Sequence, residues 1–510
     1  MTSPKKTKIH IGSILFPILY TLMLFLVAAI IYLYSNGYRF DIFNKGLIQS
    51  GVLGVESSPI TADLYINDKL IGKTPKSSSL EVGTYSTTLK MEGYYDWSKE
   101  VEIVEGKSTP IYPWLIKKDP EAIAKWTSSG TLEKYWVSPY FSHTLILTKE
   151  NEKYTLWEYT LNPALWDFSS NPSIILELES DSIDITMSPS GQSALLKIAS
   201  GTTSQYYIID TNSQQTLSNL KPLQIDPTIA YTISWANNNA YLMLESSKEI
   251  IAYNIRLNTT LTLFTKEEGL TYTWVTDDQG FFYIVEDATK TDDSFFTYRL
   301  KQISLDGASN KYIIDNFYFS KSDEYIQKYR SQGFASVEFA SAPECTYAAG
   351  IVELIEVNQK AQGVYMKTNL ATYWYNIESQ KFMMISPYPA SLVAFNPNSQ
   401  ELLFNDSYQI GVYTFDKTEG DHTVTIGTKS VKNITDITKI QNLRWLPNTY
   451  NIIYSEDNSI FVADRDGENK SFIANPSQTL TFLFRDSQSS VLTFTTDDQG
   501  RIVVSEYDIH

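Results

Sequence analysis

The residues best suited to catalysis are few and widely separated in this sequence. Only four histidines occur among the 510 residues, namely His10, His143, His422 and His510. The spacings that mark metalloproteases, zinc ribbons, serine hydrolases and P-loop enzymes do not occur in it. We therefore predict no catalytic residue, no cofactor and no metal site. An enzyme built from this chain would have to rely on paired carboxylates.

Two further features could carry chemistry, an acidic turn and a single thiol. The stretch from Asp464 to Asn469 alternates carboxylates, and such a pattern can converge on a calcium ion. It lies between two apolar runs and lacks the Glu that closes an EF-hand loop, so a hairpin turn is the favoured interpretation. Cys345 is the only cysteine, and an inert thiol is favoured over a reactive one.

The N-terminal segment predicts how the rest of the chain is held. From Ile11 to Tyr34 there are 24 residues without a charge, and about 20 apolar residues suffice to cross the hydrocarbon core of a membrane. Lys5, Lys6 and Lys8 precede this run, and an excess of Lys and Arg marks the cytoplasmic flank. No small-residue cleavage site follows it. The pattern predicts an uncleaved single-pass anchor with its N-terminus in the cytoplasm.

The remaining chain is acidic and has no disulfide. The formal net charge is -17, and the first 40 residues hold four Lys or Arg and no acid, so the rest carries 37 basic and 58 acidic side chains. Such a surface repels nucleic acid, which we exclude as a partner. A hydrophobic fraction of 43% can supply cores without covalent links. An exported protein without disulfides favours a bacterial surface.

Short strands are predicted directly after the anchor. Between Leu53 and Leu115, apolar and polar residues alternate in short runs broken by Gly, Pro and Asn or Asp, which is typical of small antiparallel strands. Residues 64–66 and 69–71 are apolar runs on either side of Asn67-Asp68. This arrangement predicts a β-hairpin.

This pattern resembles the PEGA domain, a small β-sandwich-like module of bacterial and archaeal surface proteins. Two positions depart from the family pattern, since Thr61 stands in place of the Gly of the Pro-x-Gly-Ala motif and Asp68 stands where the family's turn prefers Gly. The resemblance implies a structural or binding module, because no catalytic residue is associated with the family. The residues that carry it are Pro59, Ala62, Gly72, Thr74, Pro75, Gly83, Gly93 and Tyr94.

The larger part of the chain repeats at a period of roughly 40 to 50 residues, which is typical of propeller blades. An eighth unit is expected between Ser341 and Ser386, and residues 322–333 look like a helical or looped insertion. The rival fold is a pair of β-sandwiches. Seven units begin with a short apolar strand that meets a polar turn, at residues 135–139, 185–189, 232–235, 271–274, 393–397, 443–447 and 481–485.

The turns after these strands resemble those of TolB-type propeller repeats, which commonly read Ser-Pro-x-Gly. The matching pieces are Ser138-Pro139, Ser188-Pro189-Ser190-Gly191 and, more loosely, Asn396-Pro397-Asn398. The sequence Thr-Asp-Asp-Gln-Gly occurs at residues 276–280 and again at 496–500. Its recurrence indicates internal duplication, although so short a turn can also recur by convergence.

The last unit shows only three strands, and residues 122–126 could supply a fourth. A ring of blades is most stable when no sheet edge is left bare, so we expect both ends of the repeat region to share one blade. Deleting residues 121–130 should then lower thermal stability sharply.

These observations together predict a mainly β protein. We expect a non-catalytic cell-surface protein in the cell membrane that binds envelope proteins or cell-wall glycans. The alternative is a propeller lyase or glycosidase acting on an envelope polysaccharide. The predicted parts are residues 1–10 in the cytoplasm, a transmembrane helix at 11–34, a juxtamembrane segment at 35–52, a PEGA-like β-sandwich domain at 53–116 and a seven- or eight-bladed β-propeller at 121–510.

Overall fold

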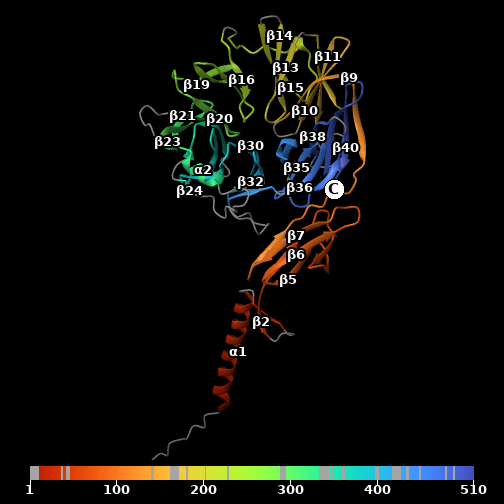
Figure 1. Cartoon of the computed structure of the whole chain (residues 1–510), viewed down its shortest axis with the longest axis vertical. Helices are drawn as coiled ribbons and strands as arrows, with labels where there is room; N and C mark the ends of the chain where they lie inside the picture. The colour runs from red at the N-terminus through yellow and green to blue at the C-terminus, as the bar shows by residue number, and fades with distance from the viewer. Residues whose placement is uncertain are drawn as a thin grey trace, which may run out of the picture. The chain divides into compact units, whose positions relative to one another are not determined.

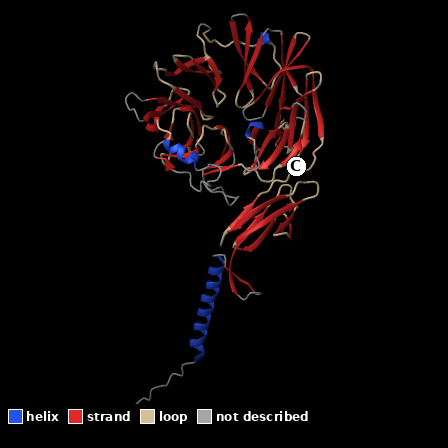
Figure 2. Cartoon of the chain, in the orientation of Figure 1, coloured by secondary structure: helices blue, strands red, loops and turns tan. Residues whose placement is uncertain are grey.

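A computed structural model shows two compact units, one made mainly of Met1–Leu115 and the other mainly of Ile116–His510. Strands dominate both units (Figure 2). The residues that the structure describes are 11–35, 38–41, 46–138, 143–160, 172–179, 182–200, 203–226, 229–287, 295–331, 344–345, 348–358, 362–396, 401–415, 427–431, 436–446, 449–476, 479–485 and 489–510.

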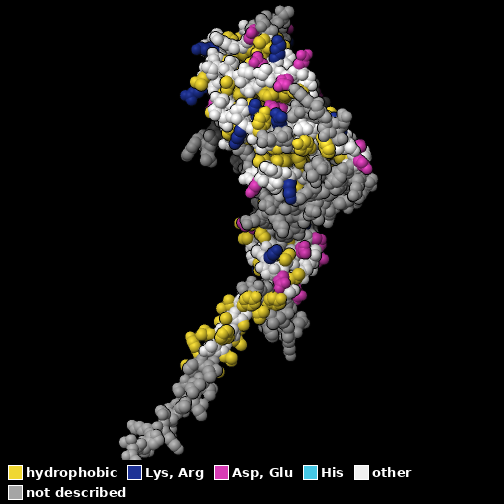
Figure 3. Space-filling model, turned by 90° about the vertical axis from the view of Figure 1, so that its left-hand side faces the viewer, with side chains coloured by type: hydrophobic (Ala, Val, Ile, Leu, Met, Phe, Trp, Pro, Cys, Tyr) yellow, Lys and Arg dark blue, Asp and Glu magenta, His cyan; other side chains and the backbone are white. Residues whose placement is uncertain are grey.

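The first described element is a long helix, α1 (Ile11–Ser35), which has no acidic residue in its first turn and no basic residue in its last. Its hydrophobic side chains are exposed, from Phe16 at 74% to Tyr32 at 68%, and they show as a yellow stretch over the helix in Figure 3. Among the described residues, no helix is both long enough and apolar enough to cross a membrane. The predicted transmembrane span is therefore not confirmed. Lys5, Lys6 and Lys8 lie outside the described residues.

Two four-stranded sheets follow in the first unit (Figure 1). In one, β2 pairs with β1 and β5 in antiparallel fashion and with β8 in parallel fashion; the other has the order β4-β3-β6-β7. The predicted hairpin is confirmed as the β3–β4 pair. The strands are β1 (Tyr38–Asp41), β2 (Gly46–Val55), β3 (Asp63–Ile66), β4 (Lys69–Lys73), β5 (Lys76–Glu81), β6 (Gly83–Lys90), β7 (Trp97–Ile103) and β8 (Ser108–Ile111).

One core lies between these two sheets. Leu53 of β2, Leu64 of β3 and Leu89 of β6 are fully buried in a single cluster with Val101 and Ile103 of β7. In β7, buried residues alternate with residues more open to solvent, because successive side chains of a strand point to opposite faces. Apolar residues at every second position therefore produce the sandwich.

The second unit consists of repeated antiparallel meanders arranged as propeller-like blades (Figure 1). Eight blades are seen in the described residues, so the larger of the two predicted blade numbers is found. The first four are β9 (Ala122–Val137) with β10 (His143–Glu150), β11 (Lys153–Thr160) and β12 (Ser173–Leu178); β13 (Ser182–Met187), β14 (Ser193–Ser200) and β15 (Thr203–Asp210); β16 (Thr232–Trp235), β17 (Tyr241–Glu245), β18 (Glu249–Asn254) and β19 (Thr259–Thr265); and β20 (Tyr272–Thr276), β21 (Phe281–Asp287), β22 (Phe295–Ser304) and β23 (Asn310–Ser320).

The remaining four blades repeat the same order. All seven predicted starting strands are found, and the expected eighth unit is the blade that contains β26–β29. These blades are β26 (Val352–Asn358), β27 (Gly363–Thr368), β28 (Thr372–Asn376) and β29 (Lys381–Ser386); β30 (Ser391–Phe395), β31 (Glu401–Asn405), β32 (Ile410–Thr414) and β33 (Gly427–Ser430); β34 (Ile440–Trp445), β35 (Asn451–Glu456), β36 (Ser459–Asp464) and β37 (Ser471–Ala474); and β38 (Thr479–Arg485), β39 (Ser490–Thr496) and β40 (Arg501–Asp508) with the first part of β9.

The repeat region closes through β9, which belongs to two blades. Its first part, from Ala122 to Thr131, pairs with β40, and its second part, from Thr131 to Val137, pairs with β10. The prediction that residues 122–126 complete the last blade is therefore confirmed. Two separate β-sandwiches are excluded as the fold, because one strand joins the first blade to the last.

A short helix, α2 (Glu324–Ser331), lies in the predicted insertion. Two small strands come after α2 in the sequence. β24 (Glu344–Cys345) pairs with β29 of the fifth blade, and β25 (Ala348–Ala349) pairs with β23 of the fourth. Single 3-10 turns occur at Leu217–Asn219 and Ile437–Lys439.

Aromatic side chains fill the space between blades. Phe317 and Phe319 of β23 share one buried cluster with Tyr373 of β28 and Phe382 of β29. The ring centroids of Phe319 and Phe382 lie 5.4 Å apart at 81°, an edge-to-face geometry that the aromatic quadrupole favours. The aromatic strands thus serve as packing between neighbouring blades.

Candidate functional sites

Some of the motif residues of the first unit lie around one threonine hydroxyl. The Oγ1 atom of Thr74 lies 2.5 Å from the Oγ atom of Ser57 and accepts the backbone N–H of Ala62 at 3.0 Å. The backbone of Thr74 exchanges two further hydrogen bonds with Thr61 and Ala62. Pro59 and Pro75 both follow cis peptide bonds beside this clasp. The motif therefore fixes the loops at one end of the sandwich, and its role here is structural.

The two departures from the family pattern fall where the backbone is left-handed. Thr61 has φ +76° and Asp68 has φ +62°. Asn67, at φ +46°, completes the turn with Asp68, and both residue types tolerate this region. A β-branched Thr does not tolerate it well, so Thr61 stores strain that the family's Gly would not. Gly93, at φ +83°, meets the same requirement before Tyr94.

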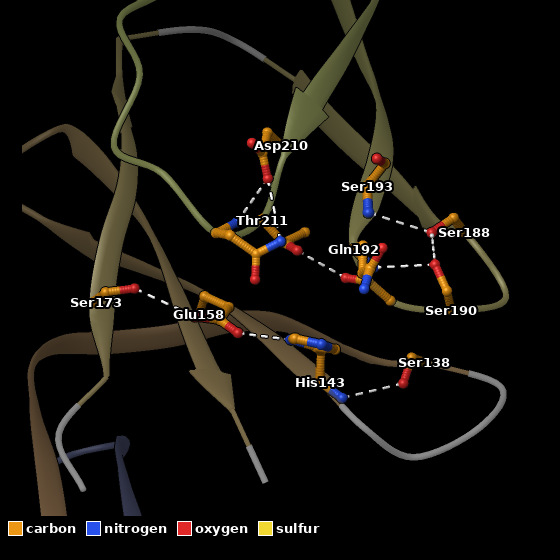
Figure 4. A network of polar contacts seen from close by, with 12 residues as sticks. Ser138, His143, Glu158, Ser173, Ser188, Ser190, Gln192, Ser193, Asp210 and Thr211 are labelled. Carbon is orange, nitrogen blue, oxygen red and sulfur yellow. Dashed lines mark hydrogen bonds and ion pairs between the residues drawn. The ribbon is translucent and has the colours of Figure 1, made fainter. Parts of the chain in front are cut away.

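Ser138 and Ser188, which begin the Ser-Pro sequences of the first two blades, each accept a backbone hydrogen bond (Figure 4). Ser138 accepts the backbone N–H of His143, and Ser188 accepts that of Ser193 five residues on. A Cβ atom on Gly191 would lie 2.7 Å from Cδ2 of His143 and 2.9 Å from Cβ of Ser138. Only glycine therefore lets the second turn pack on the first. Pro139 and residues 140–142 lie outside the described residues.

His143 is the histidine that the fold buries beside a carboxylate. Its Nδ1 atom lies 2.7 Å from Oε1 of Glu158, whose Oε2 atom accepts the Ser173 hydroxyl at 3.3 Å. In Figure 4 the ring points toward Glu158, whereas Ser138 meets the backbone of His143. A hydrolytic triad requires a nucleophile hydrogen-bonded to the ring, whereas the bonds found here join β10, β11 and β12 of one blade. We therefore assign His143 and Glu158 a structural role in holding these strands together.

The repeated Thr-Asp-Asp-Gln-Gly sequence forms the same turn in two different places. Asp277 accepts the backbone N–H groups of Gln279 and Phe281, and Asp497 accepts those of Gln499 and Arg501. The first copy joins the first and second strands of its blade, whereas the second copy joins the second and third strands. These positions lie at opposite ends of a meander. The two copies therefore share one local turn and do not occupy equivalent places in their blades.

The acidic turn after β36 is a hairpin, as predicted. The carboxylate of Asp464 accepts the side-chain amides of Asn451 at 3.0 Å and Asn469 at 2.8 Å. The next residue, Arg465, forms a buried ion pair of 2.5 Å with Glu401 of the preceding blade. In the described part of the chain, no group of three or more His, Cys, Asp or Glu side chains is placed to hold a metal ion.

Tryptophan side chains join neighbouring blades, which the repeat period did not reveal. At the end of β16, Trp235 donates its Nε1–H to the carbonyl of Thr186 in β13 at 2.8 Å. At the end of β34, Trp445 donates to the carbonyl of Ala394 in β30 at 3.1 Å. Each bond connects the first strands of successive blades. The sequence signal is a Trp at the end of the starting strand.

Three side chains form an exposed aromatic site that the sequence did not single out. The ring centroids of Tyr388 and Tyr408 lie 4.1 Å apart. The guanidinium carbon of Arg330 in α2 lies 4.8 Å from the ring of Tyr388. Tyr408 is 68% exposed. We call these three residues the tyrosine platform.

One carboxyl on a first strand has an altered acidity. Burial raises the pKa of Glu356 in β26 to about 7. Glu356 pairs across the ladder with Tyr365 of β27, whose pKa burial also raises. A carboxyl that is half protonated near neutral pH can act as a general acid. Of the other chemical candidates, His10 and His422 lie outside the described residues, and Cys345 lies in β24.

Comparison with known proteins identifies the first unit. No curated protein matches the sequence. The similar solved structures include an uncharacterized protein, lmo1340, from Listeria monocytogenes EGD-e, which is 12% identical over 71% of this chain and 100% of its own, with a TM-score of 0.37. They also include the WD40 domain of SCAP from fission yeast, which is 10% identical over 77% of this chain and 98% of its own, with a TM-score of 0.41.

Prolyl oligopeptidase B from Galerina marginata is a further similar structure, 13% identical over 75% of this chain and 56% of its own, with a TM-score of 0.38. Similarity at this level carries no information on activity. The sequence model of the PEGA domain matches residues 50–117. The chain therefore contains a PEGA domain, which precedes a large β-propeller-like unit.

Proposed function

We propose that this protein is a non-catalytic, membrane-anchored surface protein whose propeller presents a binding site outside the cytoplasm. The observation that carries the proposal is the tyrosine platform, an aromatic surface that is exposed although its backbone is fixed. Two pairs of buried ionisable groups, by contrast, contact one another within or between blades, Glu158 with His143 and Glu401 with Arg465. A rigid ring with recognition residues on its loops suits binding.

The anchor proposal rests on α1. The 24 residues from Ile11 to Tyr34 carry no charge, and the described large hydrophobic side chains of the helix are solvent-exposed, as Phe25 is at 72%. Exposed apolar surface of this extent requires an apolar environment. Deleting residues 1–35 should release the protein from membranes into the soluble fraction after cell lysis. If the truncated protein stays with the membranes after an alkaline wash, α1 is not the anchor.

The binding proposal is tested by crosslinking in intact cells that express the full chain with an affinity tag. We expect the wild-type chain to capture envelope proteins or cell-wall glycans, and the Tyr408→Ala variant to capture less. Tyr112, which is 54% exposed in the PEGA domain, provides a matched control as Tyr112→Ala. Capture of no surface component by the wild-type chain would reject the proposal.

The second candidate is a lyase or glycosidase that cleaves an envelope polysaccharide with paired carboxylates, of which Glu356 would be one. Its carboxyl, with a pKa raised to about 7, has the acidity expected of a general acid. An enzyme of this kind should release sugars from an envelope polysaccharide, with activity that falls as the pH rises above 7 and that is abolished in Glu356→Gln. If wild-type and variant proteins both leave the polysaccharide intact, this candidate is rejected.

A further inference from the structure

We propose that the tyrosine platform binds a sugar ring that carries an acidic substituent. This inference rests on the proposed binding function and narrows it to one class of ligand. The platform lies where the turn between β31 and β32, the connection between β29 and β30, and helix α2 come together, because these segments supply Tyr408, Tyr388 and Arg330 in turn.

The ring of Tyr408 is open to a ligand. At 68% exposed, it is the most exposed large hydrophobic side chain described in the propeller-like unit. The planes of Tyr408 and Tyr388 are inclined by 37° at a centroid distance of 4.1 Å, so the second ring supports the first. An exposed aromatic ring offers apolar contact at a low entropic cost, since it has only two side-chain torsions.

The platform is built in advance of any ligand. Asp406 is 4% exposed, and its Oδ1 atom accepts the backbone N–H of Tyr408 at 2.8 Å. Its Oδ2 atom accepts the hydroxyl of Ser386 at 2.6 Å, and that hydroxyl accepts the backbone N–H of Tyr388 at 3.1 Å. One carboxylate therefore fixes the backbone of both tyrosines. Such preorganisation reduces the ordering cost of binding.

Arg330 supplies the charge. Its Nε and Nη2 atoms donate to the carbonyls of Pro387 at 2.9 Å and Leu370 at 2.7 Å. Neutral carbonyls hold the guanidinium in place, and none of the ion pairs found among the described residues involves Arg330. Guanidinium groups match the geometry of carboxylate and phosphate. The preferred ligand therefore bears one of these groups.

The size of the platform favours a sugar over a protein. A sugar ring has an apolar C–H face and a rim of hydroxyl groups, so one exposed aromatic ring beside fixed polar groups fits a single sugar. A stable protein interface buries about 1,200–2,000 Å² with an apolar centre. The platform offers one ring face. Among the aromatic side chains described in the propeller-like unit, the next most exposed is Tyr318 at 49%, and it belongs to another blade.

The test is calorimetric titration of the detergent-solubilised full chain with polygalacturonate, an acidic polysaccharide, and with dextran, a neutral one. We expect polygalacturonate to bind more tightly than dextran and Tyr408→Ala to weaken it about tenfold. Tyr112→Ala should bind like the wild type. Arg330→Gln should lose the preference for the acidic polysaccharide, and Arg330→Lys should keep part of it. Melting curves of all variants check that the fold is intact.

The results that would reject the sugar site differ from those that would reject the proposed binding function. If polygalacturonate does not bind the wild-type chain, or if Tyr408→Ala and Tyr112→Ala bind it equally, the sugar subsite is wrong. Crosslinked cells then separate two cases. A protein whose capture requires Tyr408 would make the platform a protein-binding site, and captured components unaffected by Tyr408→Ala would place the binding surface elsewhere on the chain.

Discussion

Closure of the repeat region depends on a buried ionic cluster between its first and last strands. Glu506 of β40 is 5% exposed, and its Oε2 atom lies 2.6 Å from Nζ of Lys125 in β9. Its Oε1 atom accepts hydrogen bonds from Arg485 at 3.2 Å and from Ser490. Replacing Glu506 with Gln removes the carboxylate and leaves two cationic side chains facing a neutral amide. We expect this variant to unfold more easily.

The size of the effect can be estimated from the geometry. Removing one partner of a buried ion pair costs about 3 to 5 kcal/mol, and the partial exposure of Lys125 places this case near the lower figure. At about 2 cal/mol/K per residue, the unfolding entropy of a unit of roughly 390 residues turns 3 kcal/mol into a lowering of Tm by about 4 °C. Differential scanning calorimetry of the full chain in detergent resolves such a shift.

The pH dependence provides a sharper criterion. Burial alone raises the pKa of Glu506, but hydrogen bonds from Lys125 and Ser490 and the charge of Arg485 together hold it below its ordinary value. A carboxyl with a lowered pKa stabilises the fold above its unfolded pKa, and this stabilisation is lost as the pH falls through the folded pKa. The difference in Tm between wild type and Glu506→Gln should therefore be full at pH 7 and vanish in acid.

A matched control is the exposed ion pair of Glu177 with Lys153, whose atoms lie 2.8 Å apart with both side chains more than 40% exposed. Glu177→Gln should change Tm little, because surface pairs contribute about 0 to 1 kcal/mol. Equal Tm values for wild type and Glu506→Gln at pH 7, or a difference that persists in acid, would refute the closure argument.

Three further substitutions test local features by thermal or urea unfolding. Thr61→Gly should stabilise the PEGA domain by about 1 kcal/mol, because it relieves a left-handed β-branched residue at φ +76°, and a loss of stability would contradict this. Gly191→Ala should destabilise the propeller-like unit by about 2 kcal/mol or more, since the new Cβ meets the ring of His143, and an unchanged midpoint would show that the turns are not packed as described. Trp235→Phe should cost about 1 to 3 kcal/mol through the unsatisfied carbonyl of Thr186, and a neutral result would remove this bond from the account of blade packing.

Local patterns in the sequence were sufficient for the strands and turns. The alternation through the first unit predicted its hairpin because strand burial depends on residues two apart, and Asn67-Asp68 supplied the left-handed turn. The spacing of the short apolar strands that begin each unit predicted the blades, because these strands too are recognised from a few neighbouring residues. The strand that completes the last blade could also be predicted, since three visible strands leave one edge unpaired.

The candidate sites depended on contacts between distant residues. The platform brings Arg330 to Tyr388 across 58 positions and Tyr388 to Tyr408 across 20, and none of these residues is unusual in its local sequence. The repeated Asp-Asp-Gln-Gly turn shows the converse, since identical residues form one local structure but fall in different hairpins.

The sequence by itself thus determined the class of each segment: an uncharged N-terminal run, a PEGA domain with its two atypical positions, and a meander repeated at blade spacing. The tertiary structure decided the number of blades, the continuation of β9 from the last blade into the first as one strand, and the exposure of Tyr408. The physical reason is that backbone torsions and side-chain alternation act over a few residues, whereas ring closure and burial are settled only when distant strands pack together.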